Sequence, residues 1–502
     1  MTTSLITTAI PYVNAAPHLG FAYELVLADI LARHRRRRGF IVRFVNGTDE
    51  NSLKNVAAAA REGVPPRVLV DRNAAAFEAL GPLLGVEPDD FVRTSTDPRH
   101  RIAVEWLWRA CRRELVRARW EGRYCAGCEA FVDDDVEVCA EHHVPPEPVS
   151  EDNWFFPLGR YRDAIRDAIT SGRLTVVPET ARVEVLAFLD GPVRDLSVSR
   201  DARRAHGWGI PVPDDPTQVI YVWFDALASY LTSLGLGGDP ALLERYWRQS
   251  ERIHVIGKGI ARFHAVYWPA FLLAAGLPLP DQILVHGYLT IDGIKIAKTG
   301  PHVAIDPIVR THGRDSLRWY FARRCRTRGD ADVKTADIAP VFDADFCNGL
   351  GNLVQRCTAL ASKLCEGRVP ASAAATGDEA AAVAGALRSA AEQLPARVDA
   401  ALADFLVDDA AAAICALVAH ANRALETLAP WQLARVDPDA AASALHAPLE
   451  AARIAAAELS PFVPEASRAI LDRLGGGAAA EWGGLRSGDA LLHGPPLFPR
   501  RA

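Results

Sequence analysis

Residues 5–21 form the stretch LITTAIPYVNAAPHLGF, in which an apolar, β-branched run is followed by a loop and then by a helix start. The run Leu5 to Ile10 predicts a buried strand, because short runs of this kind bounded by turn residues are typical of sheet interiors. Further along, Ala22, Val26 and Ile30 recur at four-residue spacing, which indicates the apolar face of a helix. The stretch therefore predicts the strand, loop and helix start of a βαβ unit.

Three further apolar runs end in polar or glycine-bearing turns in the same way. They are Ile41 to Val45 before Asn46-Gly47-Thr48-Asp49, Ile253 to Ile256 before Gly257-Lys258, and Ile283 to Val285 before His286-Gly287. We predict that these strands and the first one form a doubly wound parallel sheet of the Rossmann-like α/β class. Ligands of such sheets bind beyond the carboxyl ends of the strands, so the polar turns predict where the active-site crevice lies.

The chain of 502 residues is long enough for about three domains. We expect the sheet in two halves, residues 1–114 and 216–287, separated by an insertion over 115–215 that is rich in acids and prolines. From about residue 350 the chain is alanine-rich with Leu, Ile and Val at helical spacing, which predicts an α-helical bundle over 348–502. Residues 288–347 connect the sheet to the bundle and carry a lysine-bearing loop.

The composition indicates a globular protein that functions in the cytoplasm. Hydrophobic residues make up 49% and charged residues 24% of the chain, and no run of apolar residues is long enough to predict a membrane span. The start Met1-Thr2-Thr3-Ser4 lacks the basic segment and cleavage site of a secretory signal. Nine cysteines, an odd number, favour reduced thiols over a disulfide framework. A net charge of −6 means that any nucleic acid would have to meet a local basic patch.

The segment Pro17-His18-Leu19-Gly20-Phe21 lies between the first expected strand and its helix. Backbone amides and the positive end of a helix favour phosphate, Gly20 permits close approach, and His18 can donate to phosphate oxygens. A histidine before a helix is, however, more often a cap or a packing residue, so this segment alone is weak evidence for a phosphate site.

A second candidate phosphate site is the loop Gly293 to Pro301. The chain has six lysines beside fifty arginines, and two of them, Lys295 and Lys298, lie in this glycine-flanked loop. Lysine is a compact, mobile point charge that suits a pyrophosphate group. Taken alone, the loop would be interpreted as a solvated surface turn.

Together, the histidine segment and the lysine loop resemble the signature pair of the class I aminoacyl-tRNA synthetases, and nearly the whole chain is similar to the methionyl branch of that family. The resemblance is carried by Thr8-Ala9-Ile10-Pro11-Tyr12, Gly47-Thr48-Asp49-Glu50, Trp208-Gly209-Ile210-Pro211-Val212-Pro213, Tyr221-Val222-Trp223-Phe224-Asp225-Ala226-Leu227, Ile256-Gly257-Lys258, Phe263-His264 and Ile305-Asp306-Pro307. So many ordered matches are more specific than either signature alone.

The resemblance implies a methionine pocket in which Asp49 holds the substrate ammonium. The other lining residues would be Ala9, Ile10, Tyr12, Trp223, Ala226, Tyr230, Ile260 and His264. These residue types suit the ligand, because a thioether favours aromatic and apolar neighbours and an ammonium needs a nearby carboxylate. Without the resemblance, Trp223 and Tyr230 would be interpreted as a core stripe on one helix face.

The resemblance also implies the residues that bind ATP, namely His18, Gly20, Phe21, Gly257, Lys258, Lys295 and Lys298. The methionine carboxylate would attack the α-phosphorus of ATP in line, with Mg²⁺ and Lys298 neutralising the departing pyrophosphate. His18, Lys295 and Lys298 would be the catalytic residues. The 2′-hydroxyl of the terminal tRNA ribose would then attack the adenylate, and residues 288–347 would contact the tRNA stem.

Four residues with metal-ligand spacing lie in the expected insertion. Cys125-x2-Cys128 and Cys139-x2-His142 are separated by ten residues, and these two knuckles would provide the ligands of a tetrahedral structural zinc. His143 is an alternative fourth ligand. The resemblance implies that this knuckle lies near the acceptor end of tRNA.

In the helical part, the resemblance implies that Asn352, Arg356 and Trp431 recognise the tRNA anticodon. Unstacked RNA bases are bound by aromatic stacking and by hydrogen bonds to their edges, which these residue types can supply. Without the resemblance, a capped helix with a buried tryptophan would be the preferred interpretation. The basic run Arg33 to Arg38 is interpreted as a helix end before Gly39, where cations complement the helix dipole.

Departures from the family pattern fall at four places near the expected chemistry. Phe21 stands where the histidine signature has its second histidine, and Asn51 and Ser52 stand where histidine and glycine are usual. Gly259 replaces an aspartate after Gly257-Lys258, and Ala297 replaces the serine of the lysine loop.

The expected activity is methionine activation and transfer to tRNA(Met) by a monomer, since the chain ends at Ala502 without the C-terminal module that dimerises some relatives. The departures leave two alternatives. One is a specialised paralogue that adenylates methionine or an analogue for another acceptor, and the other is a non-catalytic tRNA-binding paralogue.

Overall fold

The computed structural model describes residues 2–125, 130–132, 135–139, 144–296, 303–371 and 378–499. The chain forms two compact units. The first unit consists of Met1–Pro17, Phe40–Ala79 and Pro88–Val285, and the second of His18–Gly39, Leu80–Glu87 and His286–Ala502. The described part of the chain contains no helix that is both long and apolar enough to cross a membrane.

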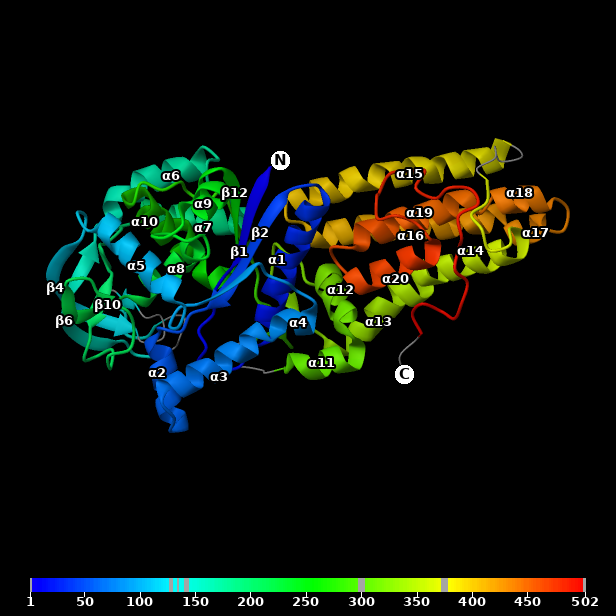
Figure 1. Cartoon of the computed structure of the whole chain (residues 1–502). Coiled ribbons are helices and arrows are strands. Elements are labelled where there is room, and N and C mark those ends of the chain that lie inside the picture. The colour runs from blue at the N-terminus through cyan, green and yellow to red at the C-terminus, as the bar shows by residue number, and fades with distance from the viewer. Residues whose placement is uncertain are drawn as a thin grey trace. The chain divides into compact units, whose positions relative to one another are not determined.

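The first unit is built on a six-stranded sheet with the order β3-β2-β1-β12-β13-β7. Its strands are β1 (Thr3–Thr8), β2 (Ile41–Thr48), β3 (Asp90–Arg93), β7 (Thr175–Val177), β12 (Ser250–Gly257) and β13 (Gln282–His286). The pairs of β1 with β2 and β12, of β2 with β3, and of β13 with β7 are all parallel. The four strands that the sequence predicted are therefore confirmed, and β3 and β7 are added at the edges. Figure 1 shows β1, β2 and β12 of this sheet.

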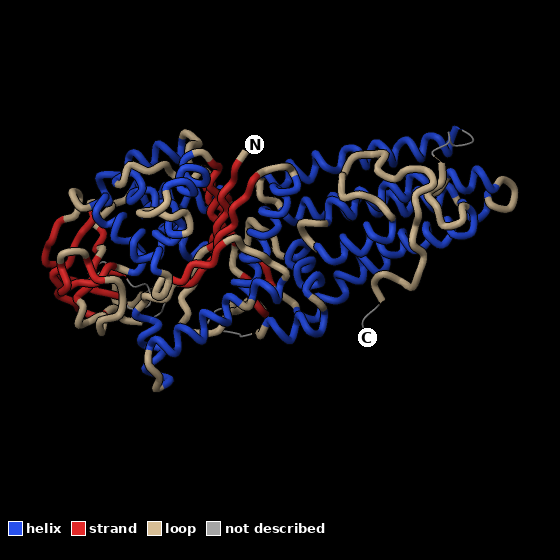
Figure 2. Tube along the Cα trace, viewed as in Figure 1, coloured by secondary structure: helices blue, strands red, loops and turns tan. Residues whose placement is uncertain are grey.

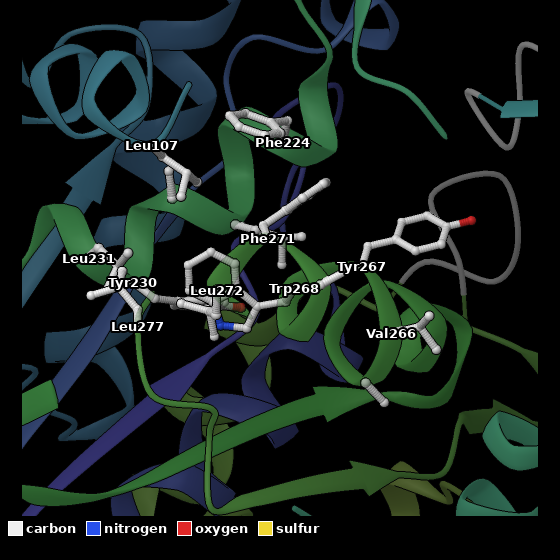
Figure 3. Packing of buried hydrophobic residues seen from close by; sticks show 14 of the residues in the cluster. Leu107, Phe224, Tyr230, Leu231, Val266, Tyr267, Trp268, Phe271, Leu272 and Leu277 are labelled. Atoms are coloured by element: carbon white, nitrogen blue, oxygen red, sulfur yellow. The ribbon is translucent and has the colours of Figure 1, made fainter. Parts of the chain in front are cut away.

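Helices of the first unit pack around a continuous apolar core. Those that contribute residues to it include α5 (Pro98–Cys111), α6 (Arg162–Thr170), α7 (Glu179–Asp190), α8 (Val222–Thr232) and α10 (Trp268–Ala274). The first unit also contains α2 (Leu53–Glu62) and α3 (Pro66–Glu78). Figure 3 shows Phe224 and Tyr230 of α8 packed with Trp268 and Phe271 of α10 in this core. Burial of such large side chains contributes roughly 2 to 3 kcal/mol each, so these aromatic contacts hold α8 firmly in place.

The stretch between β3 and β11 also forms two smaller antiparallel sheets. The four-stranded sheet has the order β5-β4-β6-β8, with β4 (Val116–Cys125), β5 (Ala130–Val132), β6 (Glu147–Phe156) and β8 (Leu196–Ser197). The three-stranded sheet has the order β10-β11-β9, with β9 (Ser199–Asp201), β10 (Pro211–Val212) and β11 (Asp215–Ile220). Strand β7, which comes from the same stretch, joins the six-stranded sheet through β13.

The second unit is mainly helical, as Figure 2 shows for the elements from α11 onward. A small sheet has the order β15-β14-β16 and consists of β14 (Leu289–Ile291), β15 (Ile294–Lys295) and β16 (Ala331–Asp332). The helices are α1 (Leu19–Arg37), α4 (Leu80–Leu84), α11 (Ile305–His312), α12 (Arg314–Arg324), α13 (Ile338–Phe342), α14 (Gly351–Leu364), α15 (Asp378–Ala403), α16 (Val407–Leu428), α17 (Pro430–Leu433), α18 (Pro438–Ser443), α19 (His446–Leu459) and α20 (Pro464–Leu474).

Helix α19 is the centre of the predicted bundle, because every one of its residues is buried. It packs against α15, α16 and α20, and its many alanines have small side chains that let neighbouring helices approach closely. Glu450, Arg453 and Glu458 are the charged residues of α19, and each is 0% exposed. Each of these buried charges has a hydrogen-bonded partner, as buried charges require.

Helix α1 confirms the apolar face that the sequence predicted, since Ala22, Val26 and Ile30 are at most 1% exposed. It ends at Arg37, with Arg38 as the C-terminal cap residue and Gly39 at a φ of 82°. The basic run therefore does end a helix, as expected. Its last arginines also have buried partners that the sequence did not indicate: Arg37 and Arg38 both bind the carboxylate of Glu458 on α19.

Candidate functional site

The loops that follow β1 and β2 lie side by side in the first unit. Tyr12 forms an isolated parallel bridge with Asp49, and the Asp49 amide donates to the carbonyl of Pro11 at 2.9 Å. Neighbouring parallel strands end at the same edge of a sheet, so these contacts follow from the pairing of β1 with β2. The structure thereby brings together two residues that the sequence assigned to the methionine pocket.

Trp223, in the first turn of α8, forms an aromatic wall next to Tyr12. The two rings meet edge to face with centroids 6.4 Å apart, and Trp223 also meets the His264 ring edge to face at 6.2 Å. Phe263 stacks on Trp223 with centroids 3.7 Å apart and an interplanar angle of 8°. Phe263 was not among the predicted pocket residues, although it stands next to His264 in the sequence.

His264 is hydrogen-bonded through both ring nitrogens. Its Nδ1 lies 3.0 Å from the carbonyl oxygen of Ile260, which can only accept, so Nδ1 carries the proton. Its Nε2 lies 2.7 Å from the Tyr230 hydroxyl, which donates to it. Burial lowers the pKa of His264 from 6.5 to about 4, so the ring is neutral at physiological pH. Hydrogen bonds thus connect Tyr230, Ile260 and His264, which are three residues of the predicted methionine pocket.

We expect the free energy of unfolding to decrease as the pH falls from 6.5 towards 4. The unfolded chain binds a proton at His264 near pH 6.5, whereas the folded chain binds it only near pH 4. Linkage gives a contribution of about 2 kcal/mol from His264 alone to the loss between pH 7 and pH 5. Urea unfolding at these two pH values measures it, and His264→Gln, which keeps an acceptor for Tyr230, should reduce the loss. An equal loss in the variant would contradict this assignment.

Asp49 lies at the end of β2 and is 2% exposed. Asn55 of α2 donates to the carbonyls of Asp49 and Glu50 at 3.2 and 2.9 Å, which secures the backbone of this turn. Gly47 is required before the turn, because a Cβ there would lie 2.3 Å from the carbonyl oxygen of Val92. The carboxylate of Asp49 is therefore held on a rigid, tightly packed backbone.

Two departures from the family pattern follow directly after this turn, and both have structural roles. The Asn51 side chain donates to the Asp225 carboxylate at 2.7 Å, and His100 binds the other oxygen of Asp225 at 2.5 Å. Ser52 caps α2 by accepting the amide of Lys54 at 3.0 Å. Sequence patterns did not indicate His100, because it lies on α5, far from either partner along the chain.

The remaining predicted pocket residues also lie in the first unit. The amide of Ala9 donates to the carbonyl of Val255 at 3.2 Å, beyond the end of β1, and Ala226 is buried in α8. Ile10 is partly buried and would contact a Cβ at position 47. Gly257 ends β12 and is followed by a short helix, Lys258–Ile260, in which Lys258 and Gly259 are exposed.

The predicted phosphate-binding residues of the second unit lie on two elements. His18 is the N-cap residue of α1, and its Nδ1 accepts the amide of Gly20 at 3.1 Å. Phe21 stacks on the His18 ring with centroids 4.1 Å apart. Lys295 is exposed on β15, with its Nζ 3.5 Å from the centroid of the Tyr288 ring. Ala297 and Lys298 lie outside the described residues.

Two of the four predicted zinc ligands lie in the described part of the chain. Cys125 ends β4 and is 0% exposed, and Cys139 is 5% exposed with its amide donating to the carbonyl of Val144 at 2.9 Å. Buried thiols beside a small sheet fit the donor set of structural zinc. Cys128, His142 and the alternative ligand His143 lie outside the described residues.

The three predicted anticodon residues lie on α14 and α17 of the second unit. The Arg356 guanidinium lies 5.2 Å from the centroid of the Trp431 ring and 3.6 Å from the carboxylate of Glu426. Asn352, one helical turn before Arg356, is exposed, and Trp431 is 37% exposed. The structure thus brings Arg356 and Trp431 together, and Trp431 is not the buried core residue of the alternative interpretation.

Known proteins are similar to this chain over nearly its whole length. A family model described as tRNA synthetases class I (M) matches residues 4–144 and 137–358, and one described as the anticodon binding domain of methionyl tRNA ligase matches residues 369–493. A methionine–tRNA ligase of Brucella melitensis is 36% identical, and the alignment covers 99% of this chain and 97% of that protein. One of Thermotoga maritima is 32% identical over 99% of this chain and 80% of that protein.

Solved structures also match over the full length. Mycobacterium tuberculosis methionyl-tRNA synthetase in complex with methionyl-adenylate has a TM-score of 0.93 and 35% identity, with 100% of both chains covered. The apo form of the enzyme from the same organism has a TM-score of 0.87 and 33% identity, with 100% of this chain and 98% of that chain covered. At 35% and 33% sequence identity, the similarity supports membership of the same family as well as the same fold.

Proposed function

The chain belongs to the methionyl branch of the class I tRNA synthetases and has the activity of that family, and we propose that it recognises methionine through Tyr12, Asp49, Trp223 and His264. The observation that carries this assignment is the arrangement of Asp49 beside Tyr12, with Trp223 next to that ring. A buried carboxylate next to an aromatic wall suits one ligand class in particular, an amino acid with a long, polarizable side chain.

In this pocket, the Asp49 carboxylate would bind the substrate ammonium. The rings of Tyr12 and Trp223 would contact the thioether, and Ala9, Ile10, Ala226 and Ile260 would complete the apolar wall. Neutral His264 would keep the Tyr230 hydroxyl oriented, because its Nε2 accepts the hydroxyl proton. Because this imidazole is uncharged, it places no second positive charge near the substrate ammonium.

Activation would begin when a methionine carboxylate oxygen attacks the α-phosphorus of ATP. A new P–O bond forms, the bond to the bridging oxygen of pyrophosphate breaks, and pyrophosphate departs with that electron pair. We assign His18, Lys295 and Lys298 to the phosphates, with Gly20, Gly257 and Lys258 as further ATP-binding residues and Phe21 as a residue of the ATP site that lies against the His18 ring. Mg²⁺ would accompany ATP through phosphate oxygens and neutralise part of their charge. The protein's contribution is positioning and electrostatic stabilisation, without a covalent enzyme intermediate.

In the second step, the 2′-hydroxyl of the terminal tRNA ribose would attack the adenylate carbonyl, and AMP would leave. Recognition of the correct tRNA is assigned to Asn352, Arg356 and Trp431. The exposed Trp431 ring offers a stacking face, and Arg356, held between Trp431 and Glu426, offers hydrogen-bond donors to a base edge.

We expect Trp431→Ala to raise the KM for tRNA in aminoacylation by about 10- to 100-fold, because one base–aromatic stacking contact contributes about 1 to 3 kcal/mol. Methionine-dependent ATP–pyrophosphate exchange should not change, since it does not involve the anticodon. Trp482→Ala serves as a control for loss of a different ring of the second unit that packs near His446. Equal tRNA affinities in Trp431→Ala and the original chain would contradict this assignment.

We also propose that Cys125, Cys128, Cys139 and His142 hold a structural zinc ion. When bound, zinc would tie the knuckle together through thiolate and imidazole ligands, with no part in the chemical steps. The two buried cysteines support this assignment.

Purified full-length chain is expected to contain about one zinc per molecule, since two Cys-rich knuckles supply one tetrahedral site. Cys125→Ser should lose the metal, as elemental analysis would measure, and should make β4 and β6 more sensitive to protease. Cys357→Ser, a matched change at a buried thiol of α14, should retain the metal. Full zinc content in Cys125→Ser would contradict the ligand assignment.

The division of the chain is proposed as a catalytic sheet in two halves (1–114 and 216–287), a connective insertion (115–215), a stem-contact region (288–347) and an anticodon-binding bundle (348–502). We further propose that the protein acts as a monomer in the cytoplasm. Size-exclusion chromatography with light scattering tests the monomer, which should give a mass near 54.4 kDa.

The proposed function is tested by ATP–pyrophosphate exchange across a panel of amino acids, followed by charging of initiator and elongator methionine tRNAs. Exchange with methionine together with charging is the expected result. Methionine-dependent exchange without charging would indicate a synthetase for a different acceptor. The absence of exchange with every amino acid would indicate a non-catalytic tRNA-binding protein.

A further inference from the structure

The start of α1 holds the His18 ring on two sides. The Phe21 ring stacks on it with centroids 4.1 Å apart and planes inclined by 24°. At its edge, Nδ1 of His18 accepts the amide of Gly20 at 3.1 Å. A Cβ at position 20 would lie 2.9 Å from Cε1 of His18, so this position of the imidazole requires glycine there.

The contact with Gly20 determines which ring nitrogen can serve a ligand. Because Nδ1 accepts a hydrogen bond, the proton of the neutral ring lies on Nε2, which becomes the donor. Rotation of the ring by half a turn would place a carbon opposite the Gly20 amide and break this bond. The stacked Phe21 ring covers one face of the imidazole and so restricts such rotation.

We propose that Phe21 is a positioning residue that keeps His18 in one orientation, with Nε2–H directed to a phosphate oxygen of ATP. This inference rests on the proposed function, which assigns His18 to the phosphates. Phe21 occupies the position of the second histidine in similar synthetases. In this chain the histidine segment therefore supplies one hydrogen-bond donor, His18, and one apolar ring that supports it, Phe21. Phe21 affects catalysis only by orienting His18.

A double-variant cycle tests this dependence. Phe21→Leu should lower kcat in methionine-dependent ATP–pyrophosphate exchange by about tenfold, because a poorly oriented donor stabilises the transition state less. The KM for methionine should stay constant, and Phe21→Tyr, which keeps the flat ring, should recover most of the loss. In a His18→Ala background, Phe21→Leu should change kcat by less than about twofold. Equal losses in both backgrounds, or no loss in either, would overturn the proposal.

Nitrogen-15 NMR of the full chain with labelled histidine provides a readout that does not depend on turnover. The His18 signals, identified by their absence in His18→Ala, should show an unprotonated Nδ1 and a protonated Nε2. Phe21→Leu should move both signals towards the average of the two tautomers. A chain without methionine-dependent exchange would refute the proposed function, whereas identical His18 signals in Phe21→Leu and the original chain would refute the role of Phe21.

Discussion

Asp49→Asn is expected to lower kcat/KM for methionine in ATP–pyrophosphate exchange by about 10² to 10³-fold. Removing one partner of a buried ion pair leaves the other charge uncompensated, which typically costs about 3 to 5 kcal/mol. Asp49 is 2% exposed, so water cannot replace its carboxylate as the partner of the substrate ammonium. Asparagine has nearly the same shape and leaves the charge as the main difference.

Asp49→Asn should affect binding without disturbing the fold. The hydrogen bonds that secure this turn use the backbone amide and carbonyl of residue 49, and asparagine keeps both groups. The KM for ATP should change little. Asp163→Asn, which removes a carboxylate that is 78% exposed on α6, is the matched control and should retain full activity. A loss of less than about fivefold in Asp49→Asn would mean that another group binds the ammonium.

Glu458→Gln is expected to lower the free energy of unfolding of the full chain by about 3 kcal/mol. Both carboxylate oxygens of Glu458 accept from Nη2 of Arg38, at 3.1 and 2.9 Å, and Nη2 of Arg37 lies 3.3 Å away. The Glu458 side chain is 0% exposed, whereas those of Arg37 and Arg38 are 13% and 22% exposed. Glutamine cannot neutralise two arginines held against the buried helix α19.

Urea unfolding followed by circular dichroism at 222 nm measures this change, because most helices in the described residues belong to the second unit. Glu465→Gln is the control, since Glu465 is 58% exposed and its pair with Arg314 should contribute less than about 1 kcal/mol. Combining Glu458→Leu with Arg38→Leu should recover part of the loss, because it removes one of the two arginines that would otherwise lie without that carboxylate. A Glu458→Gln chain as stable as the original would contradict this account.

The departures from the family pattern differ in what they do to the structure. Asn51 and Ser52 form local hydrogen bonds that support the turn after β2, through Asp225 and the amide of Lys54. Phe21 replaces a polar side chain by a stacking ring. Gly259 is exposed and has no side chain that could form a new contact. Among the departures in the described residues, it is therefore the one with the least structural compensation.

The arrangement of the sheet and the strand-end part of the candidate site could be predicted from sequence. Apolar runs with short polar turns predict parallel strands, and parallel neighbours place their carboxyl ends at one edge, which is why Tyr12 and Asp49 lie together. Strand β7 could not be predicted, because it has only three residues and its pairing with β13 depends on the folded chain.

Local pattern by itself determined the strands β1, β2, β12 and β13, the apolar face of α1 and its end before Gly39, because strand and helix periodicity are properties of neighbouring residues. Tertiary structure alone decided that Phe263 stacks on Trp223, that His100 binds Asp225, and that Arg38 binds Glu458. These pairs join residues from different elements, up to 420 positions apart. No local periodicity selects such a partner, since each contact exists only after packing has buried one side chain against another.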